Sequence, residues 1–187
     1  MKPILYLILS SILIGALAFT INIFDDDASG VMKIKIEHKY DAPISTVFNK
    51  LEDHVEFGKM FNLDVKRIKD GNQNANGVGS VRRVPSLFNT FYDETILDYK
   101  LNEMIVYSVT NGSPVKNHRG VISFNNLGNG TLVTWNIEFE SKYPIPYSGL
   151  YIMKKIEEGL IWGLGNLEII IKDEIESSKE PVISMVD

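Results

Sequence analysis

In the segment Lys33–Tyr40, every second residue is charged and the residues between them are mainly apolar or aromatic. This strict alternation is the pattern of a β-strand that is buried on one side. The positions on the less charged face are Ile34, Ile36, His38 and Tyr40. Pro43 then suits the first turn of a helix, where its missing N–H costs nothing. Val47, Phe48 and Leu51 form the apolar face of that helix, and a second short helix is predicted over His54–Phe61.

The chain from residue 65 to residue 141 alternates strand patterns with turn-forming residues, which indicates an antiparallel meander. In the last strand, every second residue from Val133 to Phe139 is apolar and the intervening residues are polar. This pattern predicts a sheet with one buried face and one wet face. The six strands are predicted at Val65–Lys69, Val78–Val84, Thr90–Tyr99, Met104–Thr110, Arg119–Asn125 and Thr131–Ser141.

A long amphipathic helix is predicted over Ser148–Ser177, because apolar residues recur there at helical spacing from Ile152 to Ile175. An apolar stripe and an apolar sheet face should pack together. We therefore predict an α+β domain over residues 32–177, in which a curved antiparallel sheet of about six or seven strands wraps around a long C-terminal helix. Residues 178–187 contain Pro181 and no periodicity, so a flexible tail is expected.

The N-terminus carries a separate apolar segment, Ile4–Phe24, which is 21 residues long and has no charge. As a helix it would cover roughly 30 Å, the thickness of a bilayer's hydrocarbon core. We expect residues 1–24 to be a single membrane anchor and residues 25–31 a linker. Lys2 on one side and Asp25–Asp27 on the other place the N-terminus in the cytoplasm and the domain on the exported side. Two alternatives are a signal peptide cleaved near Ala18 and a buried helix of a soluble domain.

Charge and cysteine content exclude several classes of function. Lys2 is the one charge before Asp25, so the rest of the chain carries −5 − 1 = −6 and has no basic run. This argues against nucleic acid as a partner and against electrostatic docking on anionic lipid. The chain has no cysteine, and its three histidines are far apart, so no metal site or cofactor is expected.

Short motifs spread from Val31 to Ile175 resemble, in their order and spacing, the START-like (helix-grip, SRPBCC) superfamily, and within it the polyketide cyclase/dehydrase and lipid-transport group. The resemblance implies a cavity between the sheet and the long helix that holds a small hydrophobic or lipid-like ligand. It carries over no catalytic residue. The motifs are Asp41-Ala42-Pro43, Gly77-x-Gly79-x-x-Arg82, Asp93-Glu94-Thr95-Ile96, Asn111-Gly112-Ser113-Pro114, His118-Arg119-Gly120 and Gly130-Thr131-x-Val133-Thr134-Trp135.

Residues of the strands and of the long helix are the candidates for lining such a cavity. Glu94 and His38 are the catalytic candidates, since either could transfer a proton if it faced the ligand. His38 could equally be a structural core residue, His118 could be solvated at the rim, and Arg82 and Glu94 could face outward. His54 is expected at the surface. The candidate ligand-binding residues are His38, Tyr40, Arg82, Glu94, Tyr107, His118, Trp135, Ile156, Leu160, Gly163, Leu164 and Leu167.

Three glycines in the long helix, Gly159, Gly163 and Gly165, require an explanation, because each glycine reduces helix stability by about 1 kcal/mol relative to alanine. They could leave room for a ligand, or they could allow close packing or a kink. Three hypotheses for function follow: a membrane-anchored domain that binds a hydrophobic ligand, an enzyme of the cyclase/dehydratase type, and an interaction domain with a filled core. The oligomeric state stays open.

Overall fold

The structure, a computed structural model, describes residues 30–86 and 90–178. The predicted anchor at residues 1–24 and most of the predicted tail lie outside these ranges. No helix within them is long and apolar enough to cross a membrane. The elements are β1 (Val31–Tyr40), α2 (Ile44–Glu52), α3 (His54–Met60), β2 (Lys66–Lys69), β3 (Val81–Pro85), β4 (Phe91–Lys100), β5 (Met104–Asn111), β6 (Val115–Asn126), β7 (Thr131–Ser141) and α4 (Ser148–Ser177).

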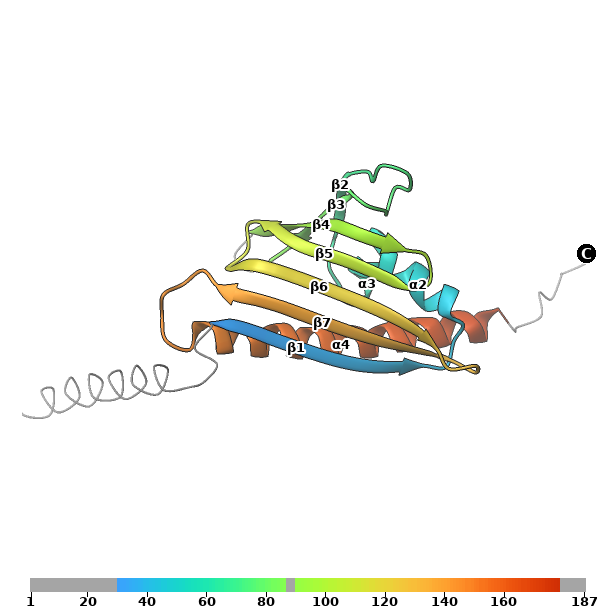
Figure 1. The fold of residues 1–187 in the computed structure, drawn as a ribbon. Helices are drawn as coiled ribbons and strands as arrows, with labels where there is room; N and C mark the ends of the chain where they lie inside the picture. Colours follow the sequence, from blue (N-terminus) through green and yellow to red (C-terminus); the bar gives the residue numbers. More distant parts are fainter. Residues whose placement is uncertain (1–29, 87–89, 179–187) are drawn as a thin grey trace, which may run out of the picture.

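The seven strands form one antiparallel sheet in the order β1-β7-β6-β5-β4-β3-β2. The first strand pairs with the last, so Val31 lies opposite Glu140 and Tyr40 opposite Thr131. Figure 1 shows the sheet curving over α4, which runs along β1 and β7, while α2 and α3 lie at one side. Both short helices also contact α4. The predicted α+β helix-grip arrangement is therefore confirmed for the described residues.

A single residue separates the two short helices. Asp53 ends α2, and its carboxylate accepts hydrogen bonds from the backbone N–H groups of Val55 and Glu56 at the start of α3. An aspartate that caps a helix in this way satisfies N–H groups that have no partner within the helix. The cap turns the chain so that both helices present their apolar sides to the sheet.

The core lies between the concave face of the sheet and α4. The alternation in β7 places Trp135, Ile137 and Phe139 inward, and all three are buried. From α4, Leu164 and Leu167 are fully buried against them. The Tyr40 hydroxyl donates a hydrogen bond to the backbone carbonyl of Leu164 at 3.1 Å, which fixes β1 to the middle of α4.

Two of the six strands predicted between residues 65 and 141 begin three or more residues away from their predicted starts, whereas the other ends of these strands agree with the prediction to within one residue. β3 begins at Val81 rather than at residue 78, because Gly79 has φ +86° and interrupts the extended chain. β6 begins at Val115, four residues before the predicted start, and continues across an irregularity between Lys116 and Arg119. The long helix occupies the predicted range, Ser148–Ser177.

Candidate functional site

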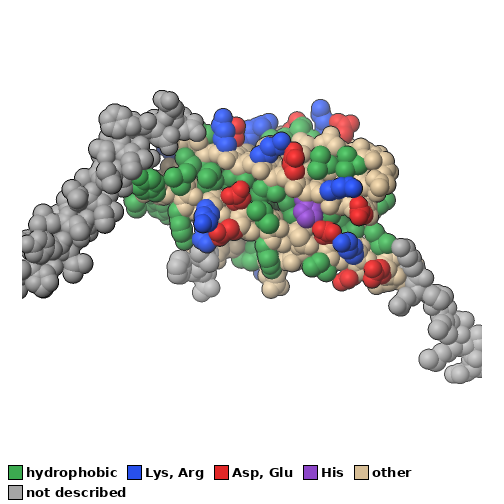
Figure 2. Space-filling model, turned by 90° about the horizontal axis from the view of Figure 1, so that it is seen from below, with side chains coloured by type: hydrophobic (Ala, Val, Ile, Leu, Met, Phe, Trp, Pro, Cys, Tyr) green, Lys and Arg blue, Asp and Glu red, His purple; other side chains and the backbone are tan. Residues whose placement is uncertain are grey.

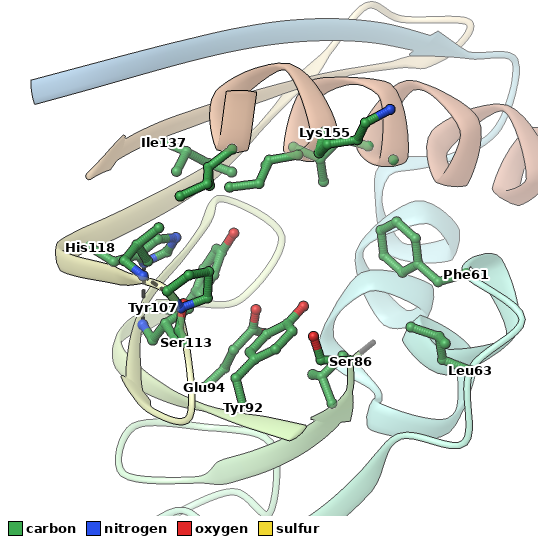
Figure 3. A pocket seen from close by; sticks show the side chains of 18 of the residues that line it. Phe61, Leu63, Ser86, Tyr92, Glu94, Tyr107, Ser113, His118, Ile137 and Lys155 are labelled. Carbon is green, nitrogen blue, oxygen red and sulfur yellow. Dashed lines mark hydrogen bonds between the residues drawn. The ribbon is translucent and has the colours of Figure 1, made fainter. Parts of the chain in front are cut away.

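A cavity of about 420 Å³ lies between the sheet and the first half of α4, with α3 at its side. Figure 3 shows its walls: α4 on one side, and side chains of β4, β5 and β6 on the opposite side. Most of its surface is apolar. The lining residues are Phe57, Phe61, Leu63, Val84, Ser86, Tyr92, Glu94, Tyr107, Val109, Ser113, Pro114, Val115, His118, Trp135, Ile137, Tyr151, Ile152, Lys155, Ile156, Gly159 and Leu160.

Helix α4 forms one wall because Ile152, Ile156 and Leu160 follow one another at intervals of four residues on the same face. Gly159 belongs to this wall, and a Cβ atom placed on it would have no heavy atom within 4 Å. Tyr151 also lines the cavity and is 67% exposed, so it marks the cavity's opening to solvent.

The opposite wall contains a buried ion pair. Glu94 lines the cavity from β4 and lies directly across from Arg82 of β3. The Arg82 Nε donates to Glu94 Oε2 at 2.6 Å, and the two residues are 2% and 5% exposed. The Arg82 guanidinium also lies 3.4 Å from the centroid of the Phe57 ring. Arg82 therefore holds the Glu94 carboxylate in place from behind the cavity wall.

Two tyrosines stand beside this pair. Burial, and secondarily the charge of Glu94, raise the pKa of Tyr92 and of Tyr107, so both phenols are neutral near pH 7. The Tyr107 hydroxyl accepts a hydrogen bond from Trp135 Nε1 at 3.0 Å, and its own proton remains available for donation. The Tyr107 ring lies over Gly120, where an added Cβ would come within 2.2 Å of it. That glycine is therefore required by the position of the ring.

His118 completes the polar part of the wall. Its Nδ1 accepts the backbone N–H of Val109 at 3.2 Å, so the neutral ring carries its proton on Nε2. Burial lowers the pKa of His118 below its ordinary value, which keeps the ring neutral at pH 7. Chemically the wall offers an imidazole N–H and two phenol groups around one carboxylate.

Six of the candidate residues lie on the cavity: Glu94, Tyr107, His118, Trp135, Ile156 and Leu160. The outward-facing alternative for Arg82 and Glu94 and the solvated alternative for His118 are wrong, since all three residues are buried. Arg82 is behind the wall, while Tyr40, Leu164 and Leu167 are core residues that do not line the cavity. Their roles toward a ligand stay predictions.

His38 does point to the inner side of β1, as predicted, but away from the cavity. Its Nε2 lies 3.0 Å from Glu168 Oε2, and its ring is tilted by 43° against the Tyr40 ring with 4.6 Å between centroids. Glu168 is twelve residues beyond Ile156 on α4, which is about 18 Å along the helix. His38 therefore contacts the second half of α4, whereas the cavity lies against the first half.

The helix glycines differ in their surroundings. A Cβ on Gly163 would come within 2.3 Å of the Phe61 ring, which is the close-packing alternative. A Cβ on Gly159 would face the open cavity, and one on Gly165 would also have no heavy atom within 4 Å, although Gly165 does not line the cavity. Gly159 thus leaves room in the cavity, whereas Gly163 allows the Phe61 ring to pack closely against α4.

The prediction that His54 lies at the surface is wrong. It is 2% exposed, and its Nδ1 accepts a hydrogen bond from Arg67 Nε at 2.8 Å. Burial, followed by the charges of Arg82 and Arg67, lowers its pKa to about 4. The short helix α3 buries His54 because it lies close to the edge strand β2, a contact that helix periodicity alone does not reveal.

Sequence reasoning missed several lining residues. Tyr92 could have been found, because it lies two residues before Glu94 and so shares its face of the strand. Ser86, Ser113 and Leu63 lie outside helices and strands, and no periodic signal exists for such positions. Across residues 30–86 and 90–178, no group of three histidine, aspartate or glutamate side chains is arranged to hold a metal ion.

Comparison with known proteins gives matches by structure. No family model matches the chain, and no curated protein matches it by sequence. The Zhui aromatase/cyclase from Streptomyces sp. R1128 superposes with a TM-score of 0.68 at 13% identity, over 81% of this chain and 99% of that one. Ara h 8.0201 superposes with a TM-score of 0.59 at 14% identity, over 76% of this chain and 99% of that one.

A protein from Nitrosospira multiformis solved by structural genomics is also similar, with a TM-score of 0.56 at 20% identity, over 71% of this chain and 93% of that one. Identities this low establish the fold and leave the activity open. Together with the sheet order and the long C-terminal helix, these likenesses show that the chain has the helix-grip (Bet v1/SRPBCC-like) fold.

Proposed function

We propose that this protein is a membrane-anchored helix-grip domain that binds a small apolar or amphipathic molecule in the cavity between its sheet and α4. The anchor would be Ile4–Phe24, with the domain on the exported side of the membrane. Cleavage near Ala18 is the alternative and would release the same domain. An anchor would keep the cavity beside the bilayer, where apolar ligands accumulate.

The observation that carries the proposal is the cavity itself. At about 420 Å³ it falls within the range of roughly 300–1,000 Å³ that is typical of small-molecule sites. Its walls are mainly aliphatic and aromatic, and Glu94, Tyr107 and His118 lie on the side opposite α4, which itself contributes Lys155. Such a distribution favours a ligand with an apolar body and a polar group at one end.

The residues of the polar wall limit which polar group the ligand can carry. The Glu94 carboxylate accepts hydrogen bonds, whereas His118 Nε2 and the Tyr107 hydroxyl can donate them. A hydroxyl or phenol group could both donate to Glu94 and accept from its neighbours. A free carboxylate would be repelled by Glu94, so we expect neutral hydroxylated ligands to bind better than fatty acids of similar size.

Substitution of a helix glycine tests the proposal. Gly159→Phe would place a ring in the cavity, whereas Gly165→Phe makes the same change on the same helix, away from the cavity and at a position where an added Cβ has no heavy atom within 4 Å. Full-length protein in mild detergent would be titrated with N-phenyl-1-naphthylamine, a neutral fluorophore that brightens in apolar sites. We expect saturable binding in the wild type and in Gly165→Phe, and none in Gly159→Phe. Equal binding in all three proteins, or in none, would contradict a ligand cavity at this place.

A second candidate function is an enzyme of the cyclase/dehydratase type. It is favoured by a carboxylate, an imidazole N–H and a phenol on one wall, and by the likeness to a protein whose name describes an aromatase/cyclase. Glu94 would take a proton from carbon, and His118 Nε2 would donate a hydrogen bond to the carbonyl oxygen of the substrate.

Glu94→Gln separates the two functions, because the amide keeps an acceptor for Arg82 but cannot take a proton. Under the enzyme hypothesis, the variant binds N-phenyl-1-naphthylamine normally but no longer converts a poly-β-carbonyl substrate. If the wild type leaves such substrates unchanged, binding without turnover is the better description.

A further inference from the structure

Apolar side chains are exposed at the end of the domain where α4 begins. We define the β7–α4 surface as Tyr143, Ile145, Leu150 and Tyr151, which are 53%, 63%, 44% and 67% exposed. They belong to an eleven-residue segment, residues 143–153, that contains no charged residue. Figure 2, which views the molecule from the α4 side, shows hydrophobic side chains gathered toward this end and charged ones over the remainder.

Hydrogen bonds hold the segment in a defined shape. Ser141 Oγ and Ser148 Oγ lie 2.9 Å apart, and both serines bond to the backbone of Tyr143. Lys142 bonds to the turn between β5 and β6 through its backbone N–H to Pro114 and its Nζ to the Ser113 carbonyl. The apolar side chains are therefore presented to solvent by an ordered loop, at a cost in free energy that a partner would remove.

The β7–α4 surface adjoins the opening of the cavity. Tyr151 belongs to both, and Lys155, one turn further along α4, also lines the cavity. Ser113 and Pro114, to which Lys142 is bonded, lie on the opposite side of the same cavity. Whatever covers this surface would meet the cavity opening.

The surface also lies where the chain enters the domain. Val31, the first residue of β1, pairs with Glu140 near the end of β7, and a Cβ atom placed on Gly149 would lie 3.2 Å from the Met32 side chain. Six residues, Asp25–Gly30, separate Phe24 from Val31. The seven steps from Phe24 to Val31 therefore span at most about 25 Å when the chain is fully extended. An anchor that ends at Phe24 would therefore keep this end of the domain within that distance of the bilayer.

The composition of the surface suits the interface of a bilayer. Tyrosine rings favour the headgroup level, where one end of the side chain is apolar and the other wet. Exposed Lys154 directly follows the uncharged segment, and its stem can extend toward lipid phosphates. Residues 25–187 together carry −6, so the attraction would be local and mainly apolar rather than the result of net charge.

We propose that the β7–α4 surface inserts into the interface of the bilayer that holds residues 4–24, so that the cavity opens toward lipid. The proposal rests on the anchoring part of the proposed function and is independent of whether the cavity holds a ligand. The other occupants to be distinguished are the chain's own N-terminal segment, folded onto the surface, and a second copy of the protein.

The natural absence of cysteine provides the test. Ile145→Cys and Tyr151→Cys would each be labelled with the fluorophore NBD in full-length protein reconstituted into phosphatidylcholine vesicles. Ile169→Cys is the control, because Ile169 is 58% exposed on the same helix and about 27 Å from Tyr151 along its axis. Flotation of the vesicles reports separately whether the protein is anchored.

We expect the NBD emission at positions 145 and 151 to be blue-shifted and quenched by doxyl-labelled phosphatidylcholine, and the emission at 169 to show neither effect. A blue shift without quenching by the doxyl lipid would mean that protein covers the surface, and would overturn the proposal. Emission typical of water at positions 145 and 151 in floating vesicles would overturn it as well. Failure to float would refute the anchor on which it rests, without bearing on probe binding by the cavity.

Discussion

Removal of the Glu94 carboxylate should destabilise the domain by leaving the Arg82 guanidinium buried without its counter-charge. Arg82 is 2% exposed, and its Nε bonds to Glu94 Oε2 at 2.6 Å. Loss of one partner from a buried pair costs about 3–5 kcal/mol. Because Glu94 lines a cavity that water can enter, we expect Glu94→Ala to fall near the lower limit, about 3 kcal/mol.

For a domain of this size, about 3 kcal/mol corresponds to a fall in Tm of roughly 6–12 °C. The assay is thermal unfolding of the full-length protein in mild detergent, followed by far-ultraviolet circular dichroism. Glu94→Gln keeps an acceptor for Arg82 and should lose less than Glu94→Ala. The double variant Arg82→Met/Glu94→Leu should be more stable than Glu94→Ala, because it leaves no buried charge without a partner.

A Tm for Glu94→Ala within about 2 °C of the wild type, a loss of less than roughly 1 kcal/mol, would refute this reasoning. It would mean that Arg82 reaches solvent or another acceptor when its partner is removed. A double variant less stable than both single variants would contradict it too, since packing rather than charge would then dominate at this place.

Two further predictions concern stability. The folded-state pKa of His54 is about 4, below the ordinary 6.5, so His54 stays neutral in the folded protein while the unfolded chain takes up a proton as the pH falls below 6.5. Stability is thus full above pH 6.5 and decreases by about 3 kcal/mol by pH 4, and His54→Asn, which keeps an acceptor for Arg67, should remove most of that decrease in urea unfolding at each pH. Gly165→Ala should stabilise α4 by about 1 kcal/mol, whereas Gly163→Ala, which overlaps the Phe61 ring, should be about 1–3 kcal/mol less stable than Gly165→Ala in the same assay.

Each of these two predictions has a definite contrary result. An unchanged pH dependence in His54→Asn would show that other groups cause the acid destabilisation. Equal stability of the two alanine variants would show that Phe61 moves aside without cost, so that packing does not require the glycine at position 163.

The strand and helix pattern allowed the fold to be predicted well, because period-2 and period-3.6 patterns report directly which face of an element is buried. The inward face of β7 and the stripe of α4 were predicted residue by residue, and both pack as expected. Boundaries were missed where the backbone itself is irregular. At Gly79 and Asn117 the chain adopts positive φ, and hydrophobic patterning carries no signal for this.

The candidate site could be predicted only in part, because it depends on position along the elements as well as on the face of each element. Periodicity correctly put His38 on an inner face, yet it could not show that this end of β1 lies against the second half of α4, beyond the cavity. The orientation of Arg82 and Glu94 was open because strand parity in the middle of the sheet was not determined. The pairing of β3 with β4 puts both side chains on the same face of the sheet, and their burial shows that this is the inner face.

Native mass spectrometry of the full-length protein, extracted from its own membrane in mild detergent, tests the central claim most directly. It reports in one spectrum the mass of the chain, and so any cleavage near Ala18, together with any molecule held by the protein. The account predicts a bound molecule of small mass in the wild type and in Gly165→Phe, and its loss in Gly159→Phe. A bound molecule that persists in Gly159→Phe would place the binding site elsewhere, and a wild-type protein that carries no molecule and binds no apolar probe would contradict the account.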